Sequence, residues 1–321
     1  MPGVKDLVSS LQKKFGKEVV AGTKTDVEFV SSGSIALDVA LGGGYPLGRI
    51  VEIIGYESSG KTTLALEAIA QAQKQLKKAC VYIDRENALD PTYAESLGVD
   101  LSEDMFVLTQ PGTAEECLEV MREVIQSKDV GIVVMDSVAA MFPKCYLDAD
   151  VGDAKMGVLA RLMSAWLPGF VGDLSNNNIL AIFINQCREK IGMVYGDPTT
   201  TPGGKALGFY ASQRLEIAKA GAVGDKGEET AIHVRARVKK NKVAPPLRKA
   251  EFDIRFGEGI DRGAEIVLLA TQYGIIEKAG SFYKYKGKTL AQGSEKVREV
   301  ILENGKLASE LEEEIIKHVD L

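Results

Sequence analysis

Cysteine and histidine are scarce in this chain. Its 321 residues contain four cysteines, Cys80, Cys117, Cys145 and Cys187, and two histidines, His233 and His318. None of the cysteines forms a Cys-x-x-Cys pair, whereas a zinc site needs closely spaced thiol or imidazole ligands. The pattern therefore argues against a zinc site, and we expect all four thiols to be reduced.

Long apolar runs and an excess of positive charge are also missing. No run reaches the roughly 18 apolar residues that span a bilayer, and the first residues, "MPGVKDLVSSLQKKF", lack the apolar centre of a signal peptide. The formal net charge of −6 argues against nucleic-acid binding through overall charge, although local basic patches stay open. We therefore expect a cytoplasmic protein with no membrane partner.

What the sequence does have is a regular alternation of apolar runs and helix-forming segments. The runs "GRIVEIIG", "ACVYIDRE", "MFVLTQP", "VGIVVMDS" and "ILAIFINQ" are separated by segments such as "TTLALEAIAQAQKQLKK" and "AEECLEVMREVIQS". Nearly continuous apolar runs are typical of parallel strands that are buried on both faces. The alternation predicts an α/β fold around a mainly parallel central sheet.

The two ends of the chain have a different pattern. Residues 4–20 are predicted to form a helix whose narrow apolar stripe must pack on another surface. After Ser212, three strand-like segments follow without helices between them, and residues 262–321 suggest a helix, a hairpin and a helix. We expect three parts, namely an N-terminal helix and linker (1–32), a core (33–260) and a small α+β C-terminal domain (261–321).

The segment "GYESSGKT", residues 55–62, fits the P-loop pattern G-x-x-x-x-G-K-[ST] between a predicted strand and a predicted helix. Backbone N–H groups in such a turn, together with the helix N-terminus, bind phosphate oxygens. Lys61 is expected to reach the β- and γ-phosphates, and the Thr62 hydroxyl to bind Mg²⁺. The alternative is a glycine-rich turn without a ligand. The expected nucleotide-binding residues of this segment are Gly55, Tyr56, Glu57, Ser58, Ser59, Gly60, Lys61, Thr62 and Thr63.

Polar residues end three of the predicted strands, where ligands bind in open α/β sheets. Asp136 is suited to hold Mg²⁺, through water, although Asp also favours the N-cap of a helix. Glu86 is predicted to be the base that activates water, and Gln186 to contact the γ-phosphate. The alternative for each is an ordinary polar residue at a strand end.

Several segments together resemble the bacterial RecA recombinase family over nearly the whole chain. They are "GYESSGKTT", "YIDRENALDP", "DSVAA", "IFINQ", "GDPTTTPGGKAL" and "KNKVAPP". The resemblance implies a RecA-like P-loop NTPase core that uses ATP and Mg²⁺ and carries DNA-binding loops. It also implies a DNA-dependent ATPase that forms a helical homo-oligomeric filament on single-stranded DNA. Such a filament pairs with homologous duplex DNA and exchanges strands in recombinational repair. In many members it also promotes self-cleavage of a LexA-type repressor in the SOS response.

The resemblance assigns roles by position. Glu86 matches the catalytic glutamate, and Gln186 matches the residue that couples the γ-phosphate to a DNA loop. Asp90 and Tyr93 match residues around the adenine. The lysines that reach the neighbouring subunit's ATP are matched by Lys240 and Lys242.

Residues 147–155 and 187–202 match the first and second DNA loops of the family. The second loop is rich in glycine and threonine, and we expect it to become ordered only on DNA. The alternative is a flexible surface loop. The expected DNA-binding residues are Met156, Arg161, Arg188, Lys190, Thr200, Gly203, Gly204 and Lys205. The hairpin "SFYKYKGK" is a further candidate, for duplex DNA, unless it is an ordinary solvated hairpin.

Four positions depart from the family pattern: Tyr56, Arg85, Pro168 and Pro202. They indicate a divergent member, of the kind that a phage or other mobile element encodes, and none removes a catalytic group. Two other functions stay open at this point. One is a ring-forming helicase or other motor with the same core, and the other is a non-enzymatic filament that protects DNA or serves as a platform for repressor cleavage.

Overall fold

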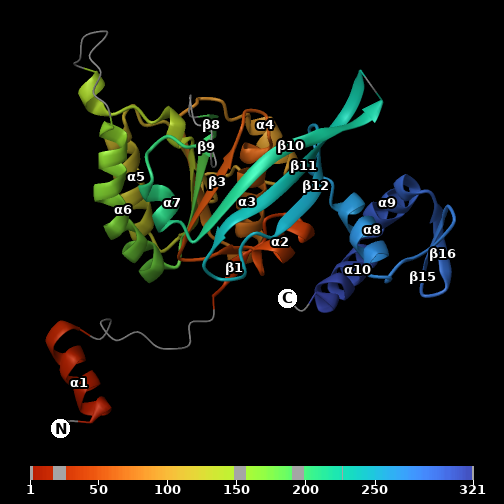
Figure 1. The fold of residues 1–321 in the computed structure, drawn as a ribbon, viewed down its shortest axis with the longest axis horizontal. Coiled ribbons are helices and arrows are strands. Elements are labelled where there is room, and N and C mark those ends of the chain that lie inside the picture. The colour runs from red at the N-terminus through yellow and green to blue at the C-terminus, as the bar shows by residue number, and fades with distance from the viewer. Residues whose placement is uncertain (1–2, 17–26, 148–156, 190–198, 226, 320–321) are drawn as a thin grey trace.

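The centre of the molecule is a nine-stranded sheet (Figure 1). The computed structural model describes residues 3–16, 27–147, 157–189, 199–225 and 227–319. Within them the strand order is β13-β12-β11-β10-β3-β7-β6-β4-β5, parallel from β10 to β5 and antiparallel from β10 to β13. The strands are β3 (Ile50–Gly55), β4 (Ala79–Asp84), β5 (Phe106–Thr109), β6 (Val130–Asp136), β7 (Leu180–Gln186), β10 (Gln213–Asp225), β11 (Glu228–Asn241), β12 (Lys249–Arg255) and β13 (Gly259–Ile260).

Alternate residues of the central strands pack on opposite faces of the sheet, as the period of a strand requires. In β6, Ile132 and Val134 join one hydrophobic cluster, while Val133 and Met135 join the other. Helices α2 (Ile35–Leu41) and α3 (Lys61–Leu76) cover the first face, and α5 (Ala114–Gln126) and α6 (Val158–Asn177) cover the second. Both faces are therefore buried, and the predicted α/β fold with a mainly parallel sheet is confirmed.

Short elements connect this framework. Two of them, β8 and β9, pair antiparallel at the two ends of the second predicted DNA loop, whose sequence alone suggested no strand. The short elements are β1 (Phe29–Val30), β2 (Tyr45–Pro46), β8 (Arg188–Glu189), β9 (Thr199–Thr200), α4 (Pro91–Ser96), α7 (Ala206–Tyr210) and the 3₁₀ helices η2 (Val138–Ala140) and η3 (Lys144–Tyr146). Within the described residues, no helix has the length and apolarity needed to cross a membrane.

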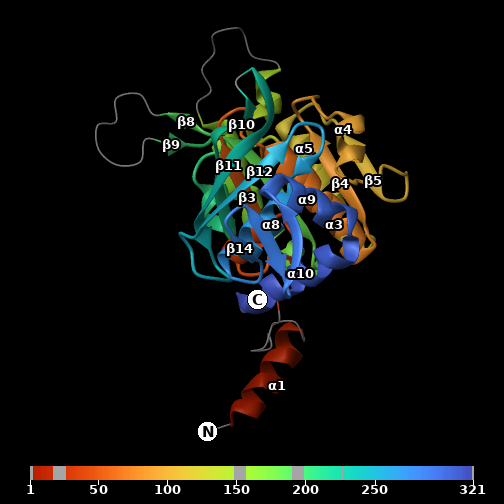
Figure 2. The same ribbon diagram turned by 90° about the vertical axis from the view of Figure 1, so that its right-hand side faces the viewer.

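The N-terminal helix α1 (Val4–Phe15) lies apart from the body of the molecule in both views (Figures 1 and 2). It ends at Phe15, and residues 17–20 of the predicted helix lie outside the described residues. None of its residues is buried, and the side chains of Leu7 and Phe15 are 54% and 59% exposed. The apolar stripe of α1 therefore has a surface to offer to a partner.

The C-terminal unit packs around its own small core, to which Ile35 of α2 also contributes. The predicted helix, hairpin and helix are present, with one more strand and one more helix. Lys286 of the hairpin, which is a candidate for binding duplex DNA, pairs with Glu310 and Glu314 of the last helix at 2.5 and 3.0 Å. The elements are α8 (Arg262–Gln272), β14 (Glu277–Ala279), β15 (Phe282–Tyr285), β16 (Lys288–Gln292), α9 (Ser294–Glu303) and α10 (Gly305–His318).

Candidate nucleotide site and DNA-binding loops

The P-loop joins the end of β3 to the start of α3 in a turn that only glycine permits at two positions. A Cβ at Gly55 would lie 2.4 Å from the backbone oxygen of Ile217. Gly60 has a left-handed φ of 95° and is the N-cap of α3, where no side chain caps the first N–H groups. Those N–H groups and the positive end of the helix dipole suit an anion. The residues present therefore fit a nucleotide's phosphates.

Lys61 and Thr62 are the first two residues of α3, directly after the P-loop turn. The Lys61 ammonium donates to the backbone oxygen of Tyr56 at 2.6 Å. Burial lowers the pKa of Lys61, and the charges of Asp136 and Glu86 oppose that change. The Thr62 hydroxyl donates to Oδ2 of Asp136 at 2.9 Å. A hydroxyl beside a carboxylate offers the hard oxygen ligands that Mg²⁺ prefers.

Asp136 ends β6 and is nearly buried. Its Oδ2 also accepts a hydrogen bond from the Tyr82 hydroxyl at 2.6 Å. Burial raises the pKa of Asp136, although the hydrogen bonds from Tyr82 and Thr62 oppose that rise. The N-cap of the following helix η2 is Ser137, so the helix-cap alternative for Asp136 is wrong.

The three polar strand ends converge. Glu86 lies in the turn that directly follows β4, is exposed, and accepts two hydrogen bonds at the same oxygen, Oε1. The donors are the Ser137 hydroxyl at 2.5 Å and the Gln186 side-chain amide at 3.2 Å. The Glu86 backbone N–H donates to Oδ1 of Asp84 at 3.1 Å, which fixes the turn. Arg85, in the same turn, donates to the backbone oxygen of Pro111.

A cavity of about 320 Å³ extends from the P-loop. Tyr93 forms part of its wall, and the hydroxyls of Tyr93 and Thr63 are 2.8 Å apart. Asp90 is exposed and serves as the N-cap of α4, accepting from the Thr92 N–H at 2.9 Å. The sequence pattern did not point to Ile232 and the segment 254–257, which complete the wall. The lining residues are Ser58, Ser59, Gly60, Lys61, Thr62, Thr63, Tyr93, Ile232, Ile254, Arg255, Phe256 and Gly257.

Several expected DNA-binding residues gather around a second cavity of about 500 Å³. Arg188 in β8 pairs in register with Thr200 in β9. Gly203 and Gly204 follow in left-handed conformations, and a Cβ on Gly204 would lie 2.7 Å from Cβ of Ala160 in α6. These glycines therefore let the segment directly after the second loop lie against the start of α6. Arg161 on α6 and Lys205 are exposed, whereas Met156 and Lys190 lie outside the described residues.

A buried polar network connects the second loop to the central strands. Asn185, one residue before Gln186, donates to the backbone oxygen of Pro202 at 3.1 Å and to Glu52 at 3.2 Å. Arg214 pairs with Glu52 at 2.7 Å and donates to the Thr201 hydroxyl at 3.2 Å. The Glu52 side chain is 1% exposed, so loss of either partner would leave a buried group uncompensated. Nothing in the sequence pattern singled out this network.

Lys240 and Lys242 lie outside the lining of the nucleotide cavity. Lys240, near the end of β11, donates to the backbone oxygens of Gly208 and Phe209 at 2.8 and 2.7 Å. Burial and the charge of Lys242 both lower its pKa. Lys242 follows β11 and is exposed, and Phe209 on α7 is 70% exposed. This surface therefore presents two cations and an aromatic ring.

Comparison with known proteins identifies the lineage. Residues 3–261 match the sequence model of the RecA N-terminal domain, and residues 264–320 match that of the RecA C-terminal domain. The chain belongs to the RecA family. It is 48% identical over 316 residues to Protein RecA of Francisella philomiragia, which covers 97% of this chain and 87% of that protein. The figures are the same for Protein RecA of Francisella tularensis subsp. novicida.

Membership of the RecA family confirms the resemblance read from the sequence motifs and makes the chain a recombinase of that family. Among solved structures, that of the RadB recombinase superposes with a TM-score of 0.56 at 24% identity, covering 72% of this chain and 98% of that chain. At that identity the likeness shows the fold alone. It agrees with the RecA-like core seen here.

Proposed function

We propose that the chain is a DNA-dependent ATPase that forms a helical filament on single-stranded DNA, pairs it with homologous duplex DNA and exchanges strands. The observation that supports this best is the hydrogen bond between Gln186 and Glu86. Gln186 ends β7, the strand from which the second loop leaves, and Glu86 also accepts from Ser137, the residue directly after Asp136. A single contact therefore joins the candidate DNA loop to the candidate hydrolytic base.

Bound MgATP supplies a γ-phosphoryl group that can be transferred to water. The N–H groups of the P-loop and Lys61 bind and neutralise its phosphates, and Thr62 with Asp136 holds Mg²⁺, Asp136 through water. Glu86 accepts the proton of the attacking water at its carboxylate. Ser137 and Gln186 orient that carboxylate through Oε1, which leaves Oε2 to receive the proton.

The filament would complete the site. Lys240 and Lys242 lie outside the nucleotide cavity of their own chain, and we assign them to the γ-phosphate that the adjacent subunit binds. Cations supplied in trans stabilise charge in the transition state, as arginine fingers do. The exposed apolar stripe of α1 supports assembly, because an amphipathic helix needs a surface to cover its apolar side.

Single-stranded DNA would bind along the two loops, with Arg161, Arg188 and Lys205 neutralising phosphates. We place this activity in the cytoplasm, where bacterial DNA lies. A repressor of the LexA type, as a further partner, is proposed from the family resemblance.

The test compares strand exchange with helicase activity. The protein, MgATP, circular single-stranded DNA and homologous linear duplex are incubated, and joint molecules are measured. We expect them to form only with homologous duplex, and electron microscopy to show helical filaments. Unwinding of a forked duplex without homology, by rings, would favour the motor alternative. Lys61→Ala is the control, since it removes the phosphate-binding cation and should abolish the products.

A further inference from the structure

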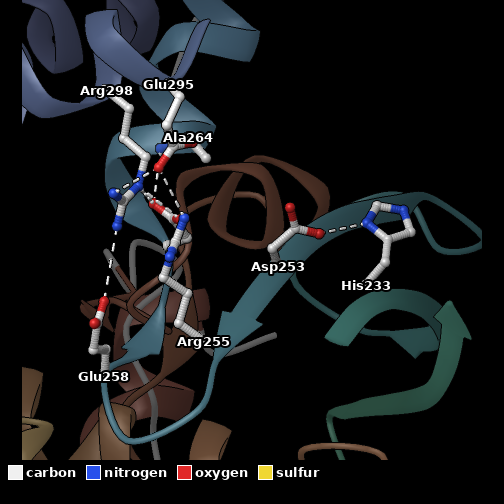
Figure 3. Close-up of polar contacts among 8 residues, drawn as sticks. His233, Asp253, Arg255, Glu258, Ala264, Glu295 and Arg298 are labelled. Carbon is white, nitrogen blue, oxygen red and sulfur yellow. Dashed lines mark hydrogen bonds and ion pairs between the residues drawn. The ribbon is translucent and has the colours of Figure 1, made fainter. Parts of the chain in front are cut away.

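A cluster of three charged side chains lies where the sheet meets the C-terminal helices. Asp261, the N-cap of α8, has a side chain that is 3% exposed. Arg298 of α9 donates from Nε to its two carboxylate oxygens at 2.7 and 2.8 Å, and Arg255 at the end of β12 donates from Nε to Oδ2 at 2.5 Å. Figure 3 shows Arg298 reaching from the C-terminal helices and Arg255 reaching from β12. The Asp261 carboxylate therefore joins the core to the C-terminal unit.

The electrostatics favour ionised groups in this cluster. Burial alone would raise the pKa of Asp261, but the hydrogen bonds from Arg255 and Arg298 outweigh it and hold that pKa below its usual value. The Glu295 carboxylate also pairs with both arginines, with oxygen–nitrogen distances of 3.1 Å to Arg255 and 3.2 Å to Arg298. Removing one arginine would redistribute the interactions of the other, because both bind the same two carboxylates.

Besides its contact with Asp261, Arg255 also lines the nucleotide cavity. Arg255, Phe256 and Gly257 form one wall of that cavity, and the P-loop forms another. In the proposed site the P-loop binds the phosphates. Residues 255–257 and Tyr93, which line the rest of the cavity, would then lie beside the nucleoside. The guanidinium of Arg255 carries N–H donors and no acceptor. Ribose oxygens and base ring nitrogens are the acceptors that it could bind.

Besides its contact with Asp261, Arg298 lines a cleft that is separate from the nucleotide cavity. With Glu295, it lines a cleft of about 660 Å³ between strands β11 and β12 and the C-terminal helices. His233 and Asp253 line the same cleft and are joined at 2.6 Å, as seen to the right of the cluster in Figure 3. The charged cluster therefore stands between the nucleotide cavity and the cleft beneath the C-terminal unit.

We propose that Arg255 contacts the nucleoside of the bound nucleotide and couples its binding to the C-terminal domain through Asp261. This inference rests on the proposed nucleotide site. A nucleotide that takes a hydrogen bond from Arg255 draws the guanidinium away from Asp261 and leaves Arg298 as that carboxylate's main partner. Because linkage is reciprocal, if nucleotide binding weakens the contact between Arg255 and Asp261, that contact weakens nucleotide binding by the same free energy.

The first test measures the affinity of a fluorescent ADP analogue, with Mg²⁺, for the full-length chain. Arg255→Gln should raise the dissociation constant roughly fivefold or more, within the usual range of coupled sites. Asp261→Asn keeps an N-cap oxygen but loses the charge that holds Arg255. It should therefore lower the dissociation constant. The double variant should behave like Arg255→Gln. The matched control is Arg235→Gln, which breaks an exposed pair with Glu251 on the same sheet, outside the cavity.

Opposite effects of the two single variants support the coupling. Equal weakening by both would show that the cluster only stabilises the fold, and would overturn the proposal. The second readout is amide hydrogen exchange with and without the ADP analogue. In the wild type, the analogue should slow amide exchange in the P-loop. It should accelerate amide exchange at the start of α8, where the Ala264 N–H donates a hydrogen bond to Asp261.

In Arg255→Gln, the P-loop response should persist while the α8 response is lost. An α8 response that survives this substitution refutes the coupling and leaves the nucleotide site intact. No P-loop protection in the wild type would instead refute the proposed nucleotide site itself. The two failures are therefore distinguishable.

Discussion

Replacing Glu86 with Gln tests the proposed base with little disturbance of the structure. Both hydrogen bonds to Glu86, from Ser137 and Gln186, end on the same oxygen, so the carbonyl oxygen of an amide can accept both. The side chain is exposed, and substitution at such a position usually changes stability by no more than about 0.5 kcal/mol. What the amide loses is the charge and the basicity of the second oxygen.

The expected loss is that of a general base, roughly 10²–10⁴-fold in turnover. At about 1.36 kcal/mol for each tenfold change, this corresponds to about 2.7–5.4 kcal/mol of barrier. The assay is steady-state ATP hydrolysis on single-stranded DNA, with nucleotide and DNA binding measured separately and expected to be retained. Glu95→Gln, an exposed glutamate on α4, is the matched control. Turnover of Glu86→Gln within a few-fold of the wild type would show that the base lies elsewhere.

Three further predictions concern DNA, assembly and pH. Arg188→Ala should make the slope of log affinity for single-stranded DNA against log salt shallower by about 0.7, the share of one phosphate contact, and an unchanged slope would remove Arg188 from the interface. Subunits that carry both Lys240→Ala and Lys242→Ala should be mixed with Glu86→Gln subunits. The mixture should regain part of the ATPase activity, because some subunit junctions pair an intact Glu86 with intact lysines. Mixed filaments that stay inactive would disprove the assignment of the lysines to the adjacent subunit's site. Burial raises the pKa of Glu265 from 4.5 to about 7, so its contribution to stability is complete below about pH 4.5 and is lost as the pH rises through 7. Glu265→Gln should therefore flatten the dependence of unfolding free energy on pH over that range, and an equally steep dependence in the variant would contradict this.

Much of the fold could be predicted because the local signals agree with one another. The apolar run of β6 identified a strand buried on both faces, and the P-loop pattern marked the turn between β3 and α3. The polar ends of these strands meet because parallel strands place their carboxyl ends at one edge of the sheet. This is why Glu86, Asp136 and Gln186 could be grouped without a structure.

The parts that the sequence did not predict depend on contacts between distant segments. Residues 254–257 border the nucleotide cavity only because β12 returns beside β11, and periodicity along the chain does not contain that pairing. The Glu52–Arg214 pair joins adjacent strands that are far apart in sequence. The ion pairs of Lys286 with Glu310 and Glu314 could not be predicted either, because the hairpin sequence does not specify the position of the helix that carries both glutamates.

The most direct test of the proposed mechanism is the rate of ATP hydrolysis by the full-length chain with and without single-stranded DNA. In the proposed mechanism, Gln186 connects the second loop to Glu86, and assembly brings Lys240 and Lys242 to the adjacent site. We therefore expect slow hydrolysis by the protein alone and a large increase when single-stranded DNA is added. Gln186→Ala should bind DNA and nucleotide but lose most of this increase. A hydrolysis rate that single-stranded DNA leaves unchanged would contradict this mechanism.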